Sequence, residues 1–198
     1  IGRRSSVVPL ASRGVRHALR VIGLVDYDPG WSETFERLRA LYSEVLEAVP
    51  VVAIEHVGGT AVDGLTAKPI IDVDIVVAPA HVQPATRTLG SIGFAPLGEQ
   101  GIPGRWAFEA PDDLPRNHTY VVEAGSLGLR NHLVVRDALR ADPELRKEYA
   151  ALKRELASSS PSSDSYASGK SAFLLGVLQG AGLDADELSA IAGANRGT

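Results

Sequence analysis

The 198-residue chain is 44% hydrophobic and 22% charged, a globular composition that excludes disordered, fibrous and collagen-like classes. At this length one domain buries roughly 70% of the surface of its unfolded chain, which suffices for a core without disulfides or structural metals. Lys and Arg number 20 against 24 Asp and Glu, so the formal charge is −4 and we expect no duplex nucleic acid as a partner. The chain has no Cys, which excludes thiol nucleophiles, disulfides and cysteine-ligated metals.

The coarse organisation follows from hydropathy. No apolar run approaches the roughly 20 residues that a bilayer span needs, so we expect a soluble, cytoplasmic protein without a membrane partner. Residues 1–18 are rich in Arg, Ser and Gly without periodicity, and we expect a disordered or added leader there. The remainder is expected to form an α/β core over 19–126 and a helical C-terminal part over 127–198, packed together as one compact unit.

Apolar periodicity predicts the elements of the core in chain order. Alternating or β-branched runs predict strands over 19–26, 51–57, 69–77, 105–109 and 118–123. Steps of three and four between apolar residues predict a helix over 31–46 after the turn sequence Asp28-Pro29-Gly30, and a weaker pattern predicts another over 80–92.

The second part of the chain has helical periodicity only. One helix is predicted from Leu127, and a second begins at Asp142, with Pro143 at its first position. The Ser-rich stretch 158–165 is typical of a linker. Further helices are predicted over 166–178 and 184–192. Strands come first and helices last, so the predicted fold class is α+β (mixed α/β).

One strand carries two carboxylates. Within 69–77 the apolar side chains alternate onto one face, which places Asp72 and Asp74 together on the other face, about 6.5 Å apart along the strand. Such a pair stays ionised only beside a compensating cation. Mg²⁺ or Mn²⁺ suits this pair, because these hard cations prefer oxygen ligands and Mg²⁺ commonly binds carboxylates together with substrate phosphates. For the pair taken alone, the solvated face of an edge strand remains an alternative.

A glycine turn precedes that strand. Gly58, Gly59 and Thr60 follow the strand over 51–57, and glycine lets the backbone approach an anion closely, so these residues are candidates for phosphate binding, with Lys68 as a neutralising charge. A plain turn is the alternative. The Walker A loop, the Gly-x-Gly-x-x-Gly fingerprint and the Gly-x-Ser-x-Gly elbow are all absent, which excludes P-loop and Rossmann interpretations and disfavours serine hydrolases.

These residues carry a family resemblance. A hydrophobic residue followed by Gly58-Gly59, a spacer, and Asp72-Val73-Asp74-Ile75 resemble the signature of polymerase-β-like nucleotidyltransferases. The longer string over 54–74 resembles the central block of the GrpB family, and the likeness continues over most of residues 20–180. The resemblance implies a nucleotidyltransferase-like mixed sheet with flanking helices and a helical C-terminal part.

The resemblance also implies an activity. We expect a Mg-dependent protein that binds a nucleoside triphosphate and transfers a nucleotidyl or phosphoryl group to an unknown acceptor. The alternative is a catalytically inactive nucleotide-binding or accessory module with a protein partner. Similar domains are fused to dephospho-CoA kinase, which makes that enzyme of coenzyme A biosynthesis a candidate partner. A phosphohydrolase that uses the same metal pair is a third interpretation.

Under the transferase interpretation Asp72 and Asp74 are catalytic residues and metal ligands. No Asp plainly supplies the third acid that active transferases commonly use, so Glu123 is the candidate for it. In the helical part, Arg130, Arg136, Lys153 and Lys170 are candidates for a triphosphate-binding wall over the sheet. Solvent-facing positions are the alternative for these basic residues.

Overall fold

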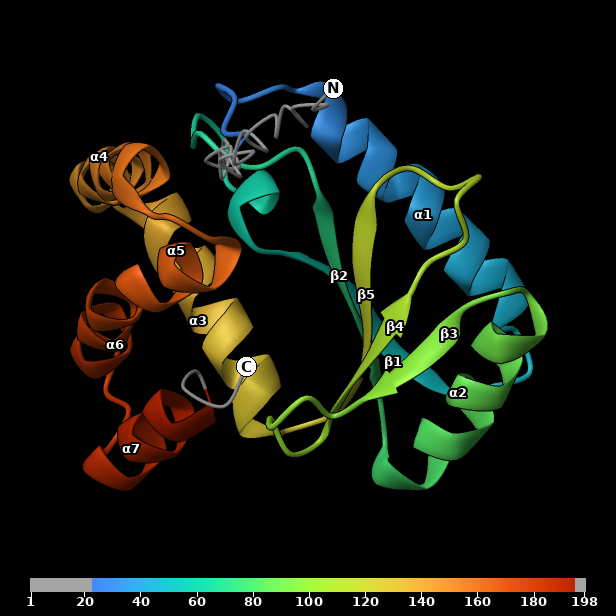
Figure 1. The fold of residues 1–198 in the computed structure, drawn as a ribbon. Helices are drawn as coiled ribbons and strands as arrows, with labels where there is room; N and C mark the ends of the chain where they lie inside the picture. Colours follow the sequence, from blue (N-terminus) through green and yellow to red (C-terminus); the bar gives the residue numbers. More distant parts are fainter. Residues whose placement is uncertain (1–22, 195–198) are drawn as a thin grey trace, which may run out of the picture.

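The computed structural model describes residues 23–194, in which five strands form one mixed sheet between two layers of helices (Figure 1). The strands are β1 (Val51–Val57), β2 (Ile71–Val77), β3 (Ala95–Gly98), β4 (Arg105–Glu109) and β5 (Asn117–Glu123). Their spatial order is β1-β2-β5-β4-β3; β2 and β5 are parallel and the other neighbours are antiparallel. The predicted α+β class, a mixed sheet with flanking helices, is confirmed.

Two groups of helices cover the two faces of the sheet (Figure 1). One face carries α1 (Gly30–Val45) and α2 (Val82–Ser91). The helices of the other side are α3 (Leu127–Ala141), α4 (Pro143–Ser159), α5 (Ser163–Gly169), α6 (Ser171–Gly180) and α7 (Ala185–Ala194). Short 3₁₀ helices, η1 (Gly59–Ala61) and η2 (Pro79–His81), follow β1 and β2. Within the described residues, every helix is too short or too polar to cross a membrane.

The alternation predicted for β2 decides which face holds polar groups. Ile71, Val73, Ile75 and Val77 are at most 2% exposed and pack in the core formed with α1 and α2. The other face of the sheet packs on α3 through Val76, Val122 and Leu129. Asp72 and Asp74 therefore project towards the helical C-terminal part, as the alternation predicts.

Side-chain caps fix the helix starts in the second part. Asp142 accepts hydrogen bonds from the backbone N–H groups of Glu144 and Leu145, which begins α4 where the sequence predicts it. The Ser-rich stretch 158–165, predicted as a linker, instead holds the end of α4 and the start of α5. Ser162 and Ser165 form a reciprocal capping box there, which explains the serines.

The remaining comparisons concern a segment that the structure describes only in part, a helix that is divided in two, and a strand that was not predicted. The predicted leader and part of the strand over 19–26 lie outside the described residues, and from 23 to 26 only Val25 forms a bridge, to Ala67. The single helix predicted over 166–178 is two helices that meet at Lys170. The exposed edge strand β3 has no apolar alternation and contains Pro96, so its pattern gives no strand signal.

Candidate functional site

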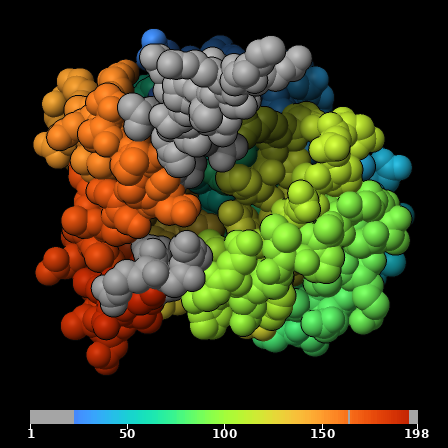
Figure 2. Space-filling model, in the orientation of Figure 1, coloured from blue at the N-terminus to red at the C-terminus, as the bar shows by residue number. Residues whose placement is uncertain are grey.

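A cavity of about 460 Å³ lies between the sheet and the helices on the α3 side, and we call it the aspartate–lysine cavity. Figure 2 shows the surface hollowed between the orange helical segment and the green and yellow strands. The residues that line it and carry the argument below are Gly58, Gly59, Lys68, Asp72, Arg105, His118, Tyr120, His132, Tyr149, Lys153, Tyr166 and Lys170. Both the sheet and the helical part therefore contribute to one site.

At Gly58 and Gly59 the backbone lies close to two charged side chains. Gly58 has a φ of 72°, and a Cβ on it would lie 2.8 Å from Cγ of Asp72 and closer still to Oδ2. A Cβ on Gly59 would lie 2.9 Å from Nζ of Lys153. Only glycine at position 58 allows both this left-handed conformation and this approach. The turn consequently lies between a carboxylate and an ammonium group.

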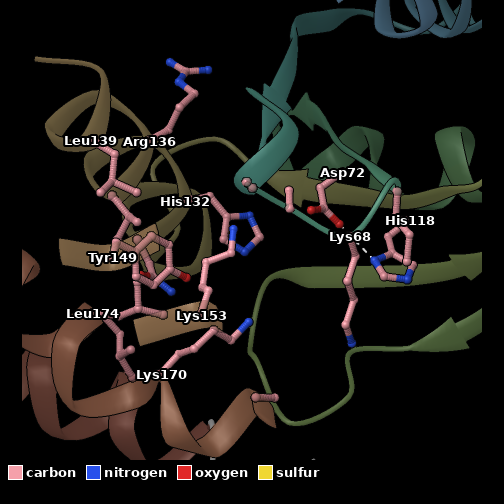
Figure 3. A pocket seen from close by; sticks show the side chains of 18 of the residues that line it. Lys68, Asp72, His118, His132, Arg136, Leu139, Tyr149, Lys153, Lys170 and Leu174 are labelled. Carbon is pink, nitrogen blue, oxygen red and sulfur yellow. Dashed lines mark hydrogen bonds and ion pairs between the residues drawn. The ribbon is translucent and has the colours of Figure 1, made fainter. Parts of the chain in front are cut away.

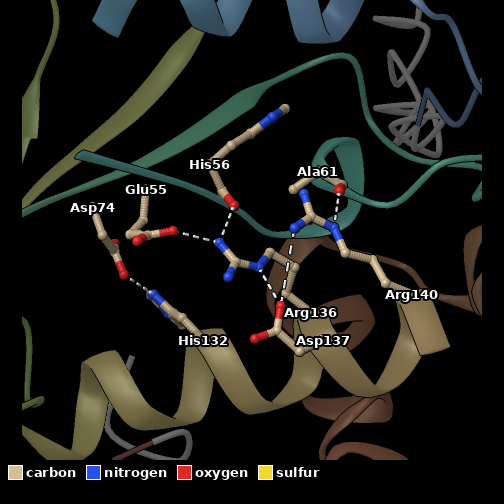
Figure 4. Close-up of polar contacts among 8 residues, drawn as sticks. All are labelled: Glu55, His56, Ala61, Asp74, His132, Arg136, Asp137 and Arg140. Carbon is tan, nitrogen blue, oxygen red and sulfur yellow. Dashed lines mark hydrogen bonds and ion pairs between the residues drawn. The ribbon is translucent and has the colours of Figure 1, made fainter. Parts of the chain in front are cut away.

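Each aspartate is paired with a histidine. Nδ1 of His118, which lies opposite Asp72 in the parallel register, donates to Oδ1 of Asp72 at 2.9 Å. Nδ1 of His132, on α3, donates to Oδ2 of Asp74 at 2.8 Å (Figure 4). Burial lowers the pKa of His132, but the charge of Asp74 and the hydrogen bond to it outweigh that effect, so the pKa is raised overall. The buried pair is therefore stabilised in its charged form.

The aspartates leave ligand capacity for a cation. Asp74 is fully buried, and among the described groups its Oδ1 has no hydrogen-bond partner, which an ion or a water molecule would remedy. The side chain of Asp72 is 27% exposed and lines the cavity. Across the described chain, His, Asp and Glu form no cluster of three or more suited to a metal ion. A Mg²⁺ ion here would take further ligands from substrate phosphates, as it commonly does.

Two lysines, the buried Lys153 and the half-buried Lys170, lie across the cavity from Asp72 (Figure 3). Lys153 on α4 is 4% exposed, and burial lowers its pKa to about 7, with Lys170 acting in the same direction and Asp72 opposing. Burial also lowers the pKa of Lys170. Within residues 23–194, neither ammonium group forms an ion pair with a carboxylate. An anion in the cavity would supply the missing opposite charge.

Aromatic rings hold the lysine side chains in place. Nζ of Lys68 lies 4.8 Å from the ring centroid of Tyr166, and Nζ of Lys170 lies 4.7 Å from the same centroid. Nζ of Lys153 lies 5.2 Å from the ring centroid of Tyr149. The rings offset part of the cost of bringing these cations together. The result is a concentration of positive charge across from Asp72.

Most of the site residues predicted from sequence come together. Gly58, Gly59, Lys68, Asp72 and Lys170 line the cavity. Asp74 does not line the cavity itself, but it accepts a hydrogen bond from His132, which does.

Thr60 is engaged in the fold instead of lining the cavity. Its hydroxyl donates to the carbonyl of Ile70 and hydrogen-bonds Nε2 of His56. His56 stacks on Phe35 with 4.6 Å between ring centroids, and burial lowers its pKa to about 4, so His56 has a structural role here.

The structure does not bring Glu123 to the aspartates. Glu123 pairs with Val77, three positions beyond Tyr120, the residue opposite Asp74, and thus roughly 10 Å further along the strand. It lines a second, smaller cavity. The strand register therefore places Glu123 too far from Asp74 to serve as the predicted third acid.

Arg130 also lies outside the aspartate–lysine cavity. It forms an ion pair with Glu187 on α7, and its side chain is 47% exposed. Arg136 lines the cavity, but its guanidinium is engaged by Glu55, Asp137 and the carbonyl of His56, so it ties α3 to β1 (Figure 4).

Sequence reasoning missed Arg105 and Tyr120. Arg105 is 8% exposed, and its guanidinium lies 4.7 Å from the ring centroid of Tyr120. A basic residue directly before the apolar run Trp106-Ala107-Phe108 is the available signal. The pairing of His118 with Asp72 requires knowing that β5 lies beside β2 in parallel, which the sequence pattern does not encode.

This mixed-sheet fold, with two aspartates on a buried strand facing lysines from the helical part, has relatives among known proteins. The family model described as GrpB protein matches residues 21–179, so the chain belongs to the GrpB family, as predicted. It is similar to the crystal structure of conserved protein GrpB from Enterococcus faecalis, with a TM-score of 0.70, 28% identity, and coverage of 85% of this chain and 99% of that chain.

Sequence relatives extend the comparison. The UPF0157 protein SCO7215 of Streptomyces coelicolor is 37% identical over 185 residues, 91% of this chain and 94% of the relative. The UPF0157 protein YqkA of Bacillus subtilis is 34% identical over 161 residues, 78% of this chain. The chain spans only 46% of that relative's length. A weaker structural likeness, with a TM-score of 0.45 and 14% identity, is to the Cid1 poly(U) polymerase, over 67% of this chain and 44% of that chain.

Proposed function

We propose that this protein binds a nucleoside triphosphate with Mg²⁺ or Mn²⁺ and transfers a nucleotidyl or phosphoryl group to an acceptor. One observation carries the proposal: a single cavity sets Asp72 on one side, with the buried Asp74 next to it on the same strand, and the amines of the buried Lys153 and the half-buried Lys170 on the other. A phosphate chain has the charge to fit between a carboxylate-bound cation and two ammonium groups.

Each group has a role in this proposal. Asp72 and the free Oδ1 of Asp74 would hold the cation, which supplies stabilisation of negative charge on the phosphate oxygens. The turn at Gly58 and Gly59 would hold the carboxylate of Asp72 and the ammonium group of Lys153 close to the backbone, on either side of the bound phosphates. Lys153 and Lys170 would neutralise the remaining phosphate charge, and the helices that carry them would exclude water from it.

A specific observation favours a second candidate, a catalytically inactive nucleotide-binding or accessory module. Both aspartates already accept a hydrogen bond from a histidine, and the strand position opposite Asp74 holds Tyr120 where a third acid would serve. Under this candidate the bound nucleotide is not consumed. The protein partner then becomes the functional question, with dephospho-CoA kinase as the partner to test first.

Thermal unfolding with each of the four common ribonucleoside triphosphates, with and without Mg²⁺, tests binding. A ligand at 100 times its Kd adds about 2.7 kcal/mol, which raises the midpoint by roughly 5–11 °C for a chain of this size. We expect that shift only with Mg²⁺, and its loss in Asp72→Asn and Asp74→Asn. The matched control is Asp113→Asn, an exposed carboxylate of the loop before β5, which keeps the shift.

Product analysis then separates the two candidates. A transferase consumes the nucleotide and labels an acceptor, whereas a binding module returns the nucleotide unchanged after long incubation with Mg²⁺. Release of free phosphate without labelled acceptor indicates the phosphohydrolase. If no nucleotide shifts the wild-type midpoint, the nucleotide-binding proposal is wrong in both forms.

A further inference from the structure

A second cavity of about 280 Å³ adjoins the aspartate–lysine cavity. Ile102, Asn131 and Ile191 line both cavities, so the two spaces meet at these residues. The second cavity lies between the 102–104 segment, the start of α3 and the end of α7. Its wall is mostly apolar, with side chains that include Pro103, Leu127 and Ala190.

Glu123 is the charged residue of this mostly apolar wall, which also includes the polar residues Ser126 and Asn131. Gly104 beside it has a φ of 75°, and a Cβ there would lie 3.3 Å from Oε2 of Glu123 and 3.2 Å from Cβ of Ser126. Glycine at position 104 therefore keeps space open next to the carboxylate. Among residues 23–194, no Lys, Arg or His forms an ion pair with Glu123.

The basic side chain that follows Gly104 in sequence is directed away from Glu123. Arg105 follows Gly104 in the chain, yet its guanidinium lies over the ring of Tyr120, in the aspartate–lysine cavity. The two cavities thus have opposite electrostatic character: lysines dominate the helical wall of the first, and a carboxylate is the charged group of the second. A cation with an apolar body complements the second cavity, because the carboxylate pairs with its charge and the wall buries its carbon atoms.

We infer that the second cavity binds the acceptor of the proposed transfer, and that this acceptor is a small aliphatic amino alcohol. Its ammonium group pairs with Glu123, its carbon chain packs on Leu127 and Ile191, and its hydroxyl group extends past Asn131 to the aspartate–lysine cavity. The acceptor role rests on the proposed function, whereas recognition of the amine rests on the second cavity alone.

In the proposed transfer, one bond to phosphorus forms while another breaks. The hydroxyl oxygen forms a bond to the α-phosphorus of the nucleoside triphosphate as the bond from that phosphorus to the pyrophosphate oxygen breaks. Pyrophosphate leaves with the electron pair of that bond, and the hydroxyl proton is released to water. The ammonium group at Glu123 keeps its protons and takes no part in the bond changes.

Binding of three matched probes, measured by isothermal titration calorimetry on the full chain, tests the inference. The probes are 5-aminopentanol, pentanol and 5-hydroxypentanoate, which share a carbon chain and differ in charge. We expect 5-aminopentanol to bind at least about tenfold more tightly than pentanol, a difference of roughly 1.4 kcal/mol, and 5-hydroxypentanoate not to bind. Equal binding of the amine and the alcohol, or no binding of the amine, overturns the inference.

Substitutions in the wall test whether 5-aminopentanol binds in the second cavity. Glu123→Gln keeps the shape of the side chain and is expected to reduce the affinity for 5-aminopentanol to that for pentanol. The control Glu109→Gln, at an exposed position of β4 outside both cavities, keeps the preference. Ala190→Phe adds a ring at an exposed helix position on the wall and is expected to abolish binding of both probes. Unchanged preference in Glu123→Gln places the amine elsewhere and contradicts the inference.

Different results would contradict the proposed nucleotide-binding function and the proposed acceptor site. Asp72→Asn is expected to remove the shift produced by Mg²⁺ and nucleotide but to leave the affinity for 5-aminopentanol unchanged, because Asp72 does not line the second cavity. Loss of amine selectivity with intact nucleotide binding counts against the acceptor site alone. Absence of nucleotide binding with intact amine selectivity counts against the proposed function and leaves an amine-binding site.

Discussion

At the scale of single residues, Gly58 is the position where backbone conformation and the carboxylate of Asp72 constrain each other. Replacing Gly58 with Ala combines a left-handed φ, which costs about 1–2 kcal/mol for an L residue, with a collision that displaces the Asp72 carboxylate. We expect Gly58→Ala to fold with reduced stability and to lose the nucleotide-dependent shift in unfolding midpoint.

Gly64 provides the matched control for this prediction. Its φ is 76°, but the nearest atom to an added Cβ is Nε of Arg146, 3.9 Å away. Gly64→Ala is therefore expected to lose only the stability that the left-handed φ costs, measured by urea unfolding, and to keep the nucleotide-dependent shift. If the two variants keep the shift equally, the contact between Gly58 and Asp72 has no part in binding.

Lys153 makes stability depend on pH. Burial lowers its pKa from 10.5 to about 7, so between pH 7 and 10.5 the unfolded chain binds more protons than the folded chain at this residue. The free energy of unfolding of the wild type should thus rise with pH across that window, relative to Lys153→Met, by roughly 1.4 kcal/mol per pH unit. Urea titrations of both proteins at pH 7 and pH 9 check the sign. A difference between them that does not change with pH would show that Lys153 keeps its ordinary pKa.

The affinity of the cavity for anions should fall as the pH rises. The ammonium form of Lys153 attracts anions, and its population falls about tenfold for each pH unit above the pKa of about 7. Sulfate is a suitable probe because its charge is constant over this range. We expect sulfate binding to the wild type to weaken between pH 7 and 9, and Lys153→Met to bind sulfate weakly at both values. Equal pH dependence in both proteins would assign the effect to a group other than Lys153.

The sequence predicts which residues belong to this site better than it predicts the side chains that hydrogen-bond them. Alternation along one strand is a local property, so the common face of Asp72 and Asp74 could be derived before the fold was known. The partners His118 and His132 come from a strand and a helix more than 40 residues away in sequence, and their approach depends on strand order and helix packing. Glu123 illustrates the same limit, because its strand was predicted but its register against β2 was not.

At the scale of elements, the packing of α5 on α4 positions Tyr166. A Cβ on Gly169 would lie 2.5 Å from Cδ2 of Leu156, so Gly169 permits this close packing. We expect Gly169→Ala to separate the two helices, to reduce stability by roughly 1–3 kcal/mol, and to weaken nucleotide binding by moving Tyr166 away from Lys68 and Lys170.

Gly176 is the control for that change. It lies within α6, and a Cβ on it meets no atom within 4 Å. Gly176→Ala should therefore raise stability by up to about 1 kcal/mol through helix propensity alone, with nucleotide binding unchanged. Urea unfolding and the nucleotide-dependent thermal shift measure both variants. A loss of stability in Gly176→Ala as large as that in Gly169→Ala would mean that contact with Leu156 is not the cause.

Elements with strong apolar patterns were predictable, and those set by tertiary contacts were not. The strand over 51–57 and the helix from Gly30 follow from β-branched residues and from a three-to-four spacing. The short strand β3 gains its hydrogen bonds only because β4 lies beside it. The break between α5 and α6 at Lys170 is likewise invisible in the periodicity, although it positions a lysine of the cavity.

At the scale of the whole molecule, the aspartate–lysine cavity exists only while the sheet and the helical part are packed together. Asp72 comes from the sheet, whereas Lys153 and Lys170 come from α4 and the junction of α5 with α6. The chain between Asp72 and Lys153 supplies three further strands, α2 and α3. A ligand that bridges these groups therefore stabilises both parts at once.

This dependence predicts cooperative unfolding of the whole molecule. Both tryptophans, Trp31 and Trp106, lie in the first part of the chain, so their fluorescence reports on the sheet and α1. Far-ultraviolet circular dichroism at 222 nm reports mainly on helices, most of which follow residue 126. If the two parts are one cooperative unit, the two signals give the same midpoint in urea, and Mg²⁺ with nucleotide raises both midpoints equally. An earlier transition by circular dichroism would mean that the helices detach while the sheet persists; the nucleotide should then move that transition most, because detachment removes Lys153 and Lys170 from the site.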